Sequence, residues 1–504
     1  MKKRKFLNSF LKIFFIILIL APAIYSFSPN PYSFWTPINV YNEIQLNKLQ
    51  LGTVTYCWTK TEVVSTESTE NSLKPKAAID DSGNLHVVWE DYTDYNGSGT
   101  DKDIFYKCWN ATSEVWTGTE VISKESINYS YDPSIITDGL GNVHIVWHDY
   151  TDYNNSGTDA DIFYKCWNAT TRVWNTTEVV FTESTNHSYN PTISVDGSEN
   201  IHVAWEDYTD YNGSGTDADI FYKYWNATTG IWNTTEVVST ESTNHSYDPS
   251  IIADGPGNLN VVWEDYTDYD SSGMDLDIFY KRWNATTHVW STTEAVSTES
   301  TNNSHNPTII LDNFGNIHLV WNDWSYYSQS GIDSDIFYKQ WNATTRVWTT
   351  TEVVSTESTY DSFSPSIAVD NSGRIHITWE DSTRYRGSGP DWDIFYKYWN
   401  VNRGVWTKSE VVSTESKYTS WYSTVVVDNS SKLHVIWWDM TNYKGSGMDW
   451  DIFYKTQKPM LPIIPILLVL SKPQTIDATF LIIFMVSIIA TGVILVITVL
   501  KKIK

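Results

Sequence analysis

An aspartate-rich segment recurs along the chain and holds the side chains best suited to chemistry. Its first copy reads Asp91-Tyr-Thr-Asp94-Tyr-Asn96-Gly97-Ser-Gly99-Thr-Asp101-Lys-Asp103. Carboxylate and amide oxygens at alternating positions, with glycines that permit a sharp bend, can surround a hard cation such as calcium. The sequence therefore predicts calcium as a candidate cofactor, with these candidate ligands in the first three copies: Asp91, Asp94, Asn96, Asp101, Asp103, Asp149, Asp152, Asn154, Asp159, Asp161, Asp207, Asp210, Asn212, Asp217 and Asp219.

Comparison among the copies supports a second interpretation of the same carboxylates. Asp91, Gly99, Asp101 and Asp103 have counterparts in all seven copies, as a turn or strand start needed by every unit would. An aspartate next to a strand can accept hydrogen bonds from backbone N–H groups of its own loop. The positions of Asp94 and Asn96 are both acidic or amide only through the fourth copy, and the later copies have Tyr326/Ser328, Arg384/Arg386 and Asn442/Lys444. Structural capping and calcium binding both stay open, and the segment is not an EF-hand because the terminal glutamate is missing.

Histidine and cysteine also recur in register, yet neither predicts a metal centre. One strand position holds His86, His144, His202, His318, His376 and His434, with Asn260 in the fourth copy. One histidine per unit cannot converge into a compact ligand set, so we expect packed or hydrogen-bonded structural histidines. Cys108 and Cys166 are equivalent positions of successive units, which should exceed the roughly 7 Å limit on bridged Cα atoms. With Cys57 they are predicted to be small packing residues.

The elements that position these side chains follow from a 58-residue period. Seven tryptophans stand at that interval without insertion or deletion: Trp58, Trp116, Trp174, Trp232, Trp290, Trp348 and Trp406. One unit contains four short apolar runs separated by turn residues: Pro191–Asp196, Ile201–Asp207, Asp219–Trp225 and Ile231–Val238. No run has the 3.6-residue period of a helix. The pattern predicts an all-β fold, a seven-bladed β-propeller of four-stranded antiparallel blades.

The two ends of the repeat predict how the ring closes. Thr53–Val64 supplies a fourth strand with no partners before it, and the last unit has only three strands, ending at Asp451–Lys455. The N-terminal strand would therefore complete the seventh blade and remove exposed sheet edges. An open solenoid is the alternative, and it would leave two raw edges.

The segments outside the repeat predict a membrane protein. Residues 1–27 have the basic start and apolar run of a signal peptide or N-terminal anchor, and residues 28–51 form a leader segment. The propeller is assigned to residues 52–455 and a stalk to residues 456–478. Residues 479–500 are uncharged and long enough for a C-terminal transmembrane helix, and the lysines in residues 501–504 predict a cytoplasmic tail. The propeller is thus expected outside the cell, at the cell membrane.

Charge and sequons agree with that compartment. A formal net charge of −26 argues against nucleic acid as a partner, because nucleic acid requires a cationic surface. Sequons of the Asn-Xaa-Ser/Thr type recur in the tight turn between the third and fourth strands, at Asn110, Asn168, Asn226, Asn284 and Asn342. They predict a glycoprotein. The alternative is that asparagine and threonine simply suit those turns.

The repeat resembles a known family. Pro133–Asp138, Gly141–Asp149, Asp161–Lys165 and Trp167–Trp174 together resemble the repeats of sialidase-superfamily propellers, which carry Asp-box (BNR) motifs. The match is degenerate, because Trp225–Trp232 keeps the length and closing tryptophan of the Asp-box but has Ala227 and Thr229 at its Asp and Gly positions. The family's catalytic arginine triad has no counterpart, since only Arg384 and Arg386 fall on the expected ligand face. Hydrolysis of glycosides by two carboxylates stays open.

These features lead to a functional hypothesis. The loops between second and third strands share one face with the connections between blades, and that face is acidic and rich in tyrosine. Its predicted ligand-contacting residues are Tyr92, Tyr95, Tyr150, Tyr153, Tyr208, Tyr211, Arg384 and Arg386. We expect a monomeric propeller that binds extracellular glycans or envelope proteins. A structural envelope component without a specific ligand and a sialidase-like glycoside hydrolase are the alternatives, and no catalytic residue is assigned. The late units, around Tyr326, Arg384, Arg386 and Lys444, are where a unique site is expected.

Overall fold

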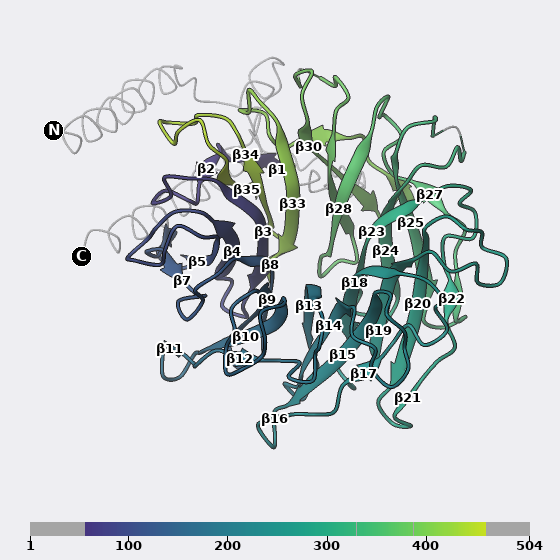
Figure 1. Cartoon of the computed structure of the whole chain (residues 1–504). Coiled ribbons are helices and arrows are strands. Elements are labelled where there is room, and N and C mark those ends of the chain that lie inside the picture. Colours follow the sequence, from purple (N-terminus) through teal and green to yellow (C-terminus); the bar gives the residue numbers. More distant parts are fainter. Residues whose placement is uncertain (1–55, 329, 387, 460–504) are drawn as a thin grey trace, which may run out of the picture. The chain divides into compact units, whose positions relative to one another are not determined.

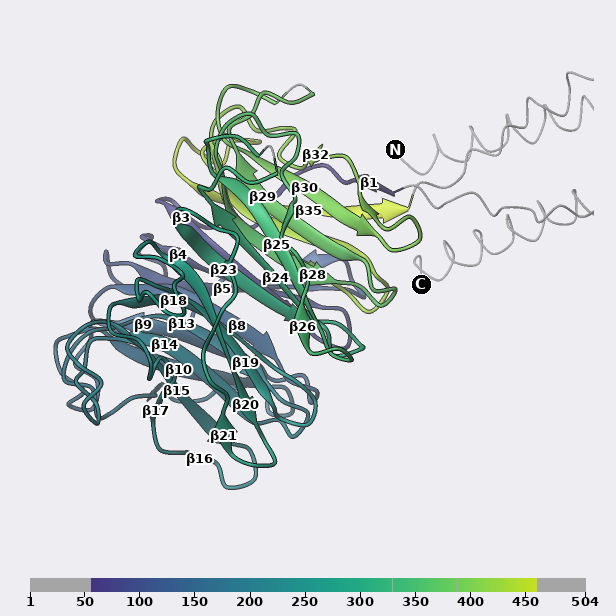
Figure 2. The same ribbon diagram turned by 90° about the vertical axis from the view of Figure 1, so that its right-hand side faces the viewer.

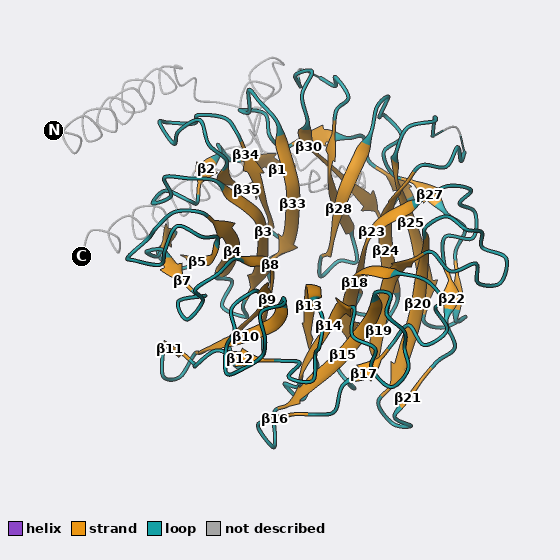
Figure 3. Ribbon diagram, viewed as in Figure 1, coloured by secondary structure: helices purple, strands orange, loops and turns teal. Residues whose placement is uncertain are grey.

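The fold is a ring of seven antiparallel sheets. The computed structural model describes residues 56–328, 330–386 and 388–459, and these contain strands and loops but no helix (Figures 1 and 3). Six sheets pair their strands in sequence order, and the seventh joins the chain's first two strands to its last three. Each sheet is one four-stranded propeller blade whose outermost strand is split in two. The predicted seven-bladed propeller is therefore confirmed.

Each blade runs outward from an innermost strand near the centre of the ring. The innermost strands are β3 (Ser72–Ile79), β8 (Ser130–Thr137), β13 (Ser188–Val195), β18 (Ser246–Ala253), β23 (Ser304–Leu311), β28 (Ser362–Val369) and β33 (Ser420–Val427). The second strands are β4 (Leu85–Asp91), β9 (Val143–Asp149), β14 (Ile201–Asp207), β19 (Leu259–Asp265), β24 (Ile317–Asp323), β29 (Ile375–Asp381) and β34 (Leu433–Asp439). The third strands are β5 (Asp103–Asn110), β10 (Asp161–Asn168), β15 (Asp219–Asn226), β20 (Asp277–Asn284), β25 (Asp335–Asn342), β30 (Asp393–Asn400) and β35 (Asp451–Pro459).

The outermost position of each blade holds two short strands where the sequence predicts one. These pairs are β1 (Tyr56–Trp58) and β2 (Glu62–Val63), β6 (Val115–Trp116) and β7 (Glu120–Val121), β11 (Val173–Trp174) and β12 (Glu178–Val179), β16 (Ile231–Trp232) and β17 (Glu236–Val237), β21 (Val289–Trp290) and β22 (Glu294–Ala295), β26 (Val347–Trp348) and β27 (Glu352–Val353), and β31 (Val405–Trp406) and β32 (Glu410–Val411). The predicted continuous strand Ile231–Val238 is thus wrong in its middle. Both halves still pair with the same third strand, so the blade stays four strands wide.

Tryptophans join each blade to the next. The period-marking Trp174 lies edge-on to Tyr106 of the preceding blade, with ring centroids 5.2 Å apart, and its indole N–H donates to Glu120 at 3.0 Å. A second set on the middle strands, such as Trp89 and Trp147, is fully buried between blades. This repeated aromatic packing explains why the tryptophan spacing tolerates no insertion.

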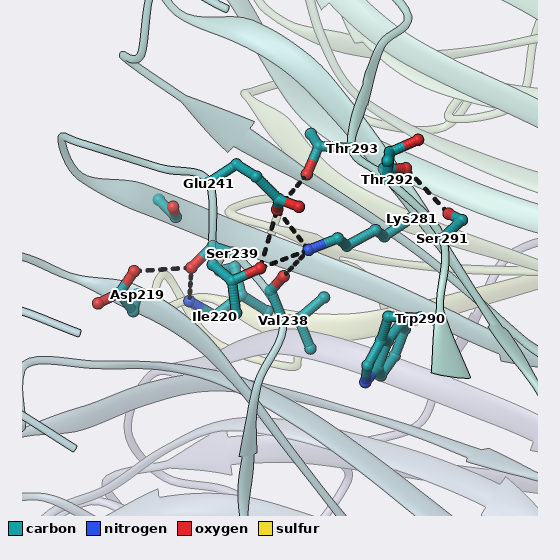
Figure 4. A network of polar contacts seen from close by, with 12 residues as sticks. Asp219, Ile220, Val238, Ser239, Glu241, Lys281, Trp290, Ser291, Thr292 and Thr293 are labelled. Atoms are coloured by element: carbon teal, nitrogen blue, oxygen red, sulfur yellow. Dashed lines mark hydrogen bonds and ion pairs between the residues drawn. The ribbon is translucent and has the colours of Figure 1, made fainter. Parts of the chain in front are cut away.

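A buried lysine in each unit clamps the connection between blades (Figure 4). Lys281 of β20 donates to the backbone carbonyl of Val238 at 2.8 Å and forms an ion pair with Glu241, both in the connection that leaves the preceding blade. Thr293 donates to the same glutamate at 2.8 Å. On the other side, Ser239 of that connection donates to Asp219 at 2.7 Å. The connection is therefore tied to both blades it joins.

The chain's first strands close the ring. β1 and β2 pair antiparallel with β35, and β1 and β35 lie side by side in Figure 2. Trp58 does in the seventh blade what the other period-marking tryptophans do elsewhere, since its ring lies edge-on to Tyr396 at 5.3 Å and its N–H donates to Glu410. The prediction of closure by the N-terminal strand is confirmed, and the open-solenoid alternative is excluded.

The predicted boundaries change at one end. β35 continues to Pro459, so the first residues of the predicted stalk at 456–478 belong to the propeller. The predicted signal segment, leader and transmembrane helix lie outside the described residues. Within the described ranges, no helix is long and apolar enough to span a membrane.

Candidate functional site

Asp91 and its counterparts are structural caps. Asp91 is fully buried at the end of β4 and accepts hydrogen bonds from the indole of Trp89 at 2.8 Å and the hydroxyl of Ser72 at 2.7 Å. The backbone N–H of Thr93 donates to its other oxygen at 2.9 Å. Asp149 has the same set of donors. With both oxygens engaged, these predicted calcium ligands serve the blade itself.

Asn96 and its counterparts form a tight turn. Asn96 has φ 56° and is followed by Gly97 at φ 81°, and the N–H of Ser98 donates to the carbonyl of Tyr95 at 3.3 Å. Asn154 and Asn212 have φ 58°. Two successive turn positions with positive φ favour asparagine and glycine for conformational reasons alone. Asn96 and Asp94 are exposed, and Asp94 accepts only a long hydrogen bond from Gly99 at 3.4 Å.

The pair Asp101 and Asp103 differs from the other predicted ligands. Asp103 is 1% exposed, one of its oxygens accepts from Ser123 at 2.6 Å, and the other has no hydrogen-bond partner among the described residues. One buried oxygen of Asp101 is also unpartnered. Burial, together with the charge of Asp101, raises the pKa of Asp103 to about 7. Equivalent unpartnered oxygens occur in every unit, on Asp161, Asp219, Asp277, Asp335, Asp393 and Asp451.

These pairs do not form a complete metal centre by themselves. In the part of the chain that the structure describes, no group of three or more histidine, cysteine, aspartate or glutamate side chains is placed to hold a metal ion. The loop therefore combines repeated caps and turns with one buried aspartate per blade, the counterpart of Asp103, that has an unpartnered oxygen.

The recurring histidines and cysteines have the predicted structural roles. His86 is buried, with Nδ1 2.7 Å from the hydroxyl of Tyr106 and Nε2 3.4 Å from Asp80. In the fourth unit Asn260 replaces the histidine and accepts from the hydroxyl of Tyr280 at 2.8 Å. The cysteines Cys57, Cys108 and Cys166 are free thiols.

The sequon asparagines are used by their own turns. The side-chain oxygen of Asn226 accepts from the N–H groups of Thr228 at 3.0 Å and Thr229 at 2.9 Å. The same bonds occur at Asn110, Asn168, Asn284 and Asn342. The turn therefore accounts for these asparagines, and glycosylation stays a prediction.

The predicted tyrosines divide into two groups. Tyr95, Tyr153 and Tyr211 pack inward, with Tyr95 5.9 Å from Phe105 between ring centroids. Tyr92, Tyr150 and Tyr208 lie nearer the connections between blades, where Tyr150 meets His187 and Tyr208 meets His245. All six side chains are half-buried, and Tyr92 and Tyr150 are the ones that line hollows on this face.

A residue in each innermost strand brings the blades together at the axis. Each innermost strand has a β-bulge, and the residue before its proline or serine has positive φ, 48° at Asp132 and Asn190. Neighbouring bulges touch, since the amide of Asn190 donates to Asp248, 58 residues later, at 3.0 Å. In most blades a glutamate of the second strand accepts the N–H of the next bulge, as Glu90 does from Asp132 at 2.8 Å. Both positions differ between blades. The bulge position holds Lys74, Asp132, Asn190, Asp248, Asn306, Ser364 and Tyr422. The second-strand position holds Glu90, His148, Glu206, Glu264, Asn322, Glu380 and Trp438.

One pocket opens where the second blade departs from the repeat. It has a volume of about 520 Å³ and is lined by Tyr131, Tyr150, Tyr189, His148, Asp132 and Glu206, together with Asn128, Tyr129 and Asn190. His148 replaces the glutamate of other blades and stacks on Tyr131, with centroids 5.3 Å apart and planes at 22°. Tyr189 meets the same imidazole edge-on at 5.1 Å. We call this hollow the mouth pocket.

The carboxyl groups of the mouth pocket have opposite pKa shifts. Burial raises the pKa of Glu206 to about 7. Burial acts on Asp132 in the same direction, but the charge of Lys74, with which it forms an ion pair, overcomes it and lowers the pKa of Asp132. Burial lowers the pKa of His148 to about 4, so the imidazole is neutral at neutral pH. The pocket thus offers aromatic faces, an ionised carboxylate and a partly protonated one.

The late units, where a unique site was expected, lie elsewhere on this face. Tyr326 is 68% exposed, and the guanidinium of Arg386 lies over its neighbour Tyr385 at 5.2 Å. Lys444 lies over Tyr443 in the same way at 4.8 Å. None of them, nor Arg384, lines the mouth pocket.

Sequence reasoning missed most of the pocket. Tyr150 was predicted, whereas Tyr131, Tyr189, His148, Asp132 and Glu206 were not. The available signal was the variation at the bulge position and at the Glu90 position across all seven units. Its meaning depends on ring closure, which places residues 58 apart next to each other.

The seven-bladed propeller fold is shared with solved structures of other proteins. No family model and no curated protein matches the chain. Among solved structures, an ulvan lyase of polysaccharide lyase family 25, bound to a fragment of glucuronate and sulfated rhamnose, is similar with a TM-score of 0.51 and 12% identity, over 78% of this chain and 95% of that one. An intramolecular trans-sialidase from Ruminococcus gnavus has a TM-score of 0.40 and 11% identity, over 78% and 95%. A protein of unknown function from Dyadobacter fermentans has a TM-score of 0.46 and 9% identity, over 80% and 99%. The propeller fold that the resemblance to sialidase-superfamily repeats implies is thus present.

Proposed function

We propose that this protein binds a glycan in the mouth pocket. The observation that carries the proposal is the concentration of four tyrosines and a histidine with Asp132, Glu206, Asn128 and Asn190 around one hollow of about 520 Å³. Aromatic faces stack on the C–H faces of pyranose rings, and carboxylate and amide groups bond to sugar hydroxyls. Fold-level similarity to proteins that act on glycans supports the same class of ligand.

The electrostatics of the pocket favour a neutral glycan. Asp132 and Glu206 present acceptors for hydroxyl donors, and the whole chain has a net charge of −26. An anionic sugar would meet like charges in a partly desolvated site, which is costly. The basic groups nearby are already paired, Lys74 with Asp132 and Lys102 with Glu90.

The test is glycan-array binding followed by titration with single-site variants. Asp132→Asn and His148→Asn install residues that other blades carry at these positions, so the fold should persist. We expect at least a tenfold loss of affinity in each, about 1.4 kcal/mol, with an unchanged melting temperature. Tyr326→Ala, on the exposed part of the same face, is the matched control and should bind normally. Binding to an envelope protein but to no glycan would contradict the proposal.

Glycoside hydrolysis is the second candidate, favoured by the opposed shifts of two carboxyl groups in one pocket. Glu206, with its pKa raised to about 7, would act as the general acid, and ionised Asp132 would act as the base or nucleophile. Assay of neutral polysaccharides for released reducing ends tests it. Glu206→Gln should abolish cleavage while retaining binding, and absence of cleavage by the unaltered protein leaves a binding module.

Calcium remains a proposal for the pair formed by Asp101 and Asp103 and its six counterparts. The unpartnered, buried carboxylate oxygens support it, because a cation would satisfy them. Ser98 and backbone carbonyls of the loop would have to supply the remaining ligands. Calcium should raise the melting temperature and magnesium should not, and equal stability in calcium and in chelator would contradict this proposal.

The cell-surface location is likewise proposed from the sequence. Residues 1–27 and 479–500 support export and a single C-terminal span. Protease digestion of intact cells should remove the propeller and leave a membrane-bound C-terminal fragment. Protection of the propeller would place it on the other side.

A further inference from the structure

A second hollow opens on the same face, between the seventh and first blades. It has a volume of about 700 Å³ and is lined by Leu73, Tyr92, Trp438 and Trp450, with Asn71 and Asp94 among the polar residues at its edge. We call it the tryptophan pocket. It combines an apolar wall with a polar rim, which is the composition of a small-molecule site.

The tryptophans that form the wall occur together in the seventh unit alone. Trp450 stacks on Trp421 with centroids 5.3 Å apart and planes at 16°, and Trp438 lies 4.7 Å from Trp450. At the position of Trp450 the second and third units have Ala160 and Ala218. A blade therefore folds without this tryptophan, and the cluster is an addition to what the repeat requires.

Trp438 also replaces the residue that other blades use to cap the next bulge. The same position in the sixth blade is Glu380, which accepts the N–H of Tyr422 at 2.8 Å. Trp438 is 8% exposed, and its indole N–H has no partner among the described residues. An unpartnered buried donor costs about 1–3 kcal/mol, so this substitution is unfavourable for folding alone.

A buried lysine contacts one tyrosine from each pocket. Lys102 lies between Tyr92 of the tryptophan pocket and Tyr131 of the mouth pocket, with Nζ 5.0 Å and 4.1 Å from the ring centroids. Its charge is paired with Glu90 at 2.6 Å. A ligand that fills one pocket can therefore continue over these two tyrosines into the other.

We infer that the tryptophan pocket is a second sugar subsite, so that the protein binds an internal stretch of a neutral polysaccharide across blades seven, one, two and three. A pyranose ring stacks on Trp450, and the polar rim of Asn71 and Asp94 bonds to its hydroxyls. The inference rests on the proposed glycan binding in the mouth pocket. It adds that affinity depends on chain length, because two linked sugars that fill two subsites bind more tightly than either alone.

Titration with sugar ladders tests the second subsite. The full-length protein is titrated by calorimetry with neutral cello-, manno- and chito-oligosaccharides of increasing length, and with oligogalacturonates as anionic controls. For at least one neutral ladder we expect affinity to rise at least tenfold with length and then level off. Trp450→Ala should abolish that rise and keep the affinity for the shortest oligomer that binds. Asp132→Asn should weaken binding at all lengths.

The matched control is Trp392→Ala. Trp392 holds the same repeat position in the sixth blade, where it stacks on Phe363 at 5.5 Å and lines neither pocket. It should keep the full length dependence. If the unaltered protein binds these oligosaccharides without length dependence, or if Trp450→Ala behaves like the unaltered protein, the second subsite is refuted while the mouth-pocket proposal stands. If none of the ladders binds, both fail together.

Discussion

The contacts between blades and the residues at the axis follow opposite rules. The clamp formed by a buried lysine and a glutamate recurs in all seven units, from Lys107 with Glu67 to Lys455 with Glu415. At the axis, the bulge position has Lys74, Asp132 and Tyr422 in different blades. Positions that every blade shares stabilise the ring, whereas positions that vary create one asymmetric surface. In this repeat, variation is therefore the better guide to the ligand.

The largest expected effect is on ring closure, on which both regions depend. Removing the chain through Val64 deletes β1 and β2 and leaves β35 as an open edge. The core between blades seven and one loses Val64, and the core between blades six and seven loses Trp58. We expect loss of more than about 5 kcal/mol and aggregation, since an unpaired edge recruits other chains. Size-exclusion chromatography and thermal melting measure both effects. As a control, a shorter deletion that removes residues only through Thr53 should behave as the intact protein. A soluble, folded monomer lacking both strands would show that the ring does not need them.

Much of the repeated frame could be predicted from sequence, and the reason is local. Strand Ile201–Asp207 was predicted with its observed bounds because its apolar alternation and flanking turn residues are contiguous in sequence. The split between β16 and β17 was not predicted, because it depends on pairing with β15. The packing of Tyr95, Tyr153 and Tyr211 against the blade cores was not predicted either, because composition does not tell which way a loop side chain turns.

The mouth pocket was beyond sequence reasoning for a geometric reason. Asn190 and Asp248 touch only because each blade is rotated about a common axis. The bulge that points them there has positive φ at residues as different as Lys74 and Tyr422, so no residue type signals it. Seven near-identical units determine the ring. The residues that differ between units can be assigned to a pocket only when the ring shows which of them are neighbours.

The next largest effect is the pH dependence of the melting temperature, which depends on Asp103 and its counterparts in the repeat and not on the mouth pocket. Burial raises the pKa of Asp103, Asp161 and Asp335 to about 7 and that of Asp219, Asp277, Asp393 and Asp451 to about 6. A carboxyl group with a raised folded-state pKa stabilises the fold below its unfolded pKa of about 4, and that contribution is lost as pH rises through the folded pKa. In chelator, the melting temperature should therefore fall by on the order of 10 °C between about pH 4 and pH 8.

Calcium is the control for this pH dependence. If it fills the carboxylate pairs, it should reduce the loss of stability at high pH, because it replaces the protons that neutralise them. Asp103→Asn should remove only a fraction of the pH dependence, since six equivalent groups remain. A melting temperature that rises steadily over this range in chelator would contradict the assigned shifts.

A smaller effect on stability should distinguish single substitutions in the contacts between blades from single substitutions in the mouth pocket. Lys281→Met removes the clamp to Val238 and Glu241 and should cost about 3 kcal/mol, because the amine is buried and its partners lose their donor. Glycan affinity should stay unchanged, since Lys281 is remote from the pocket lining. Asp132→Asn should have the opposite profile, with weak binding and normal stability. Urea denaturation and glycan titration measure the two quantities, and Lys444→Met, at an exposed lysine, is the control for stability. If Lys281→Met and Lys444→Met both weaken glycan binding equally, the contacts between blades and the mouth pocket are coupled.

The smallest effect is expected at a position where another unit of the repeat already has the substituted residue. His202 is buried, with Nδ1 2.8 Å from the hydroxyl of Tyr222, and in the next blade Asn260 accepts the equivalent bond from Tyr280 at 2.8 Å. His202→Asn should therefore preserve the bond to Tyr222 and cost less than about 1 kcal/mol. His202→Leu leaves that buried hydroxyl without an acceptor and should cost about 1–3 kcal/mol, with no change in glycan affinity. Urea denaturation of both variants measures the difference. If asparagine and leucine are equally destabilising, the histidine has a role that Asn260 does not perform, and shared positions would then carry more than the frame.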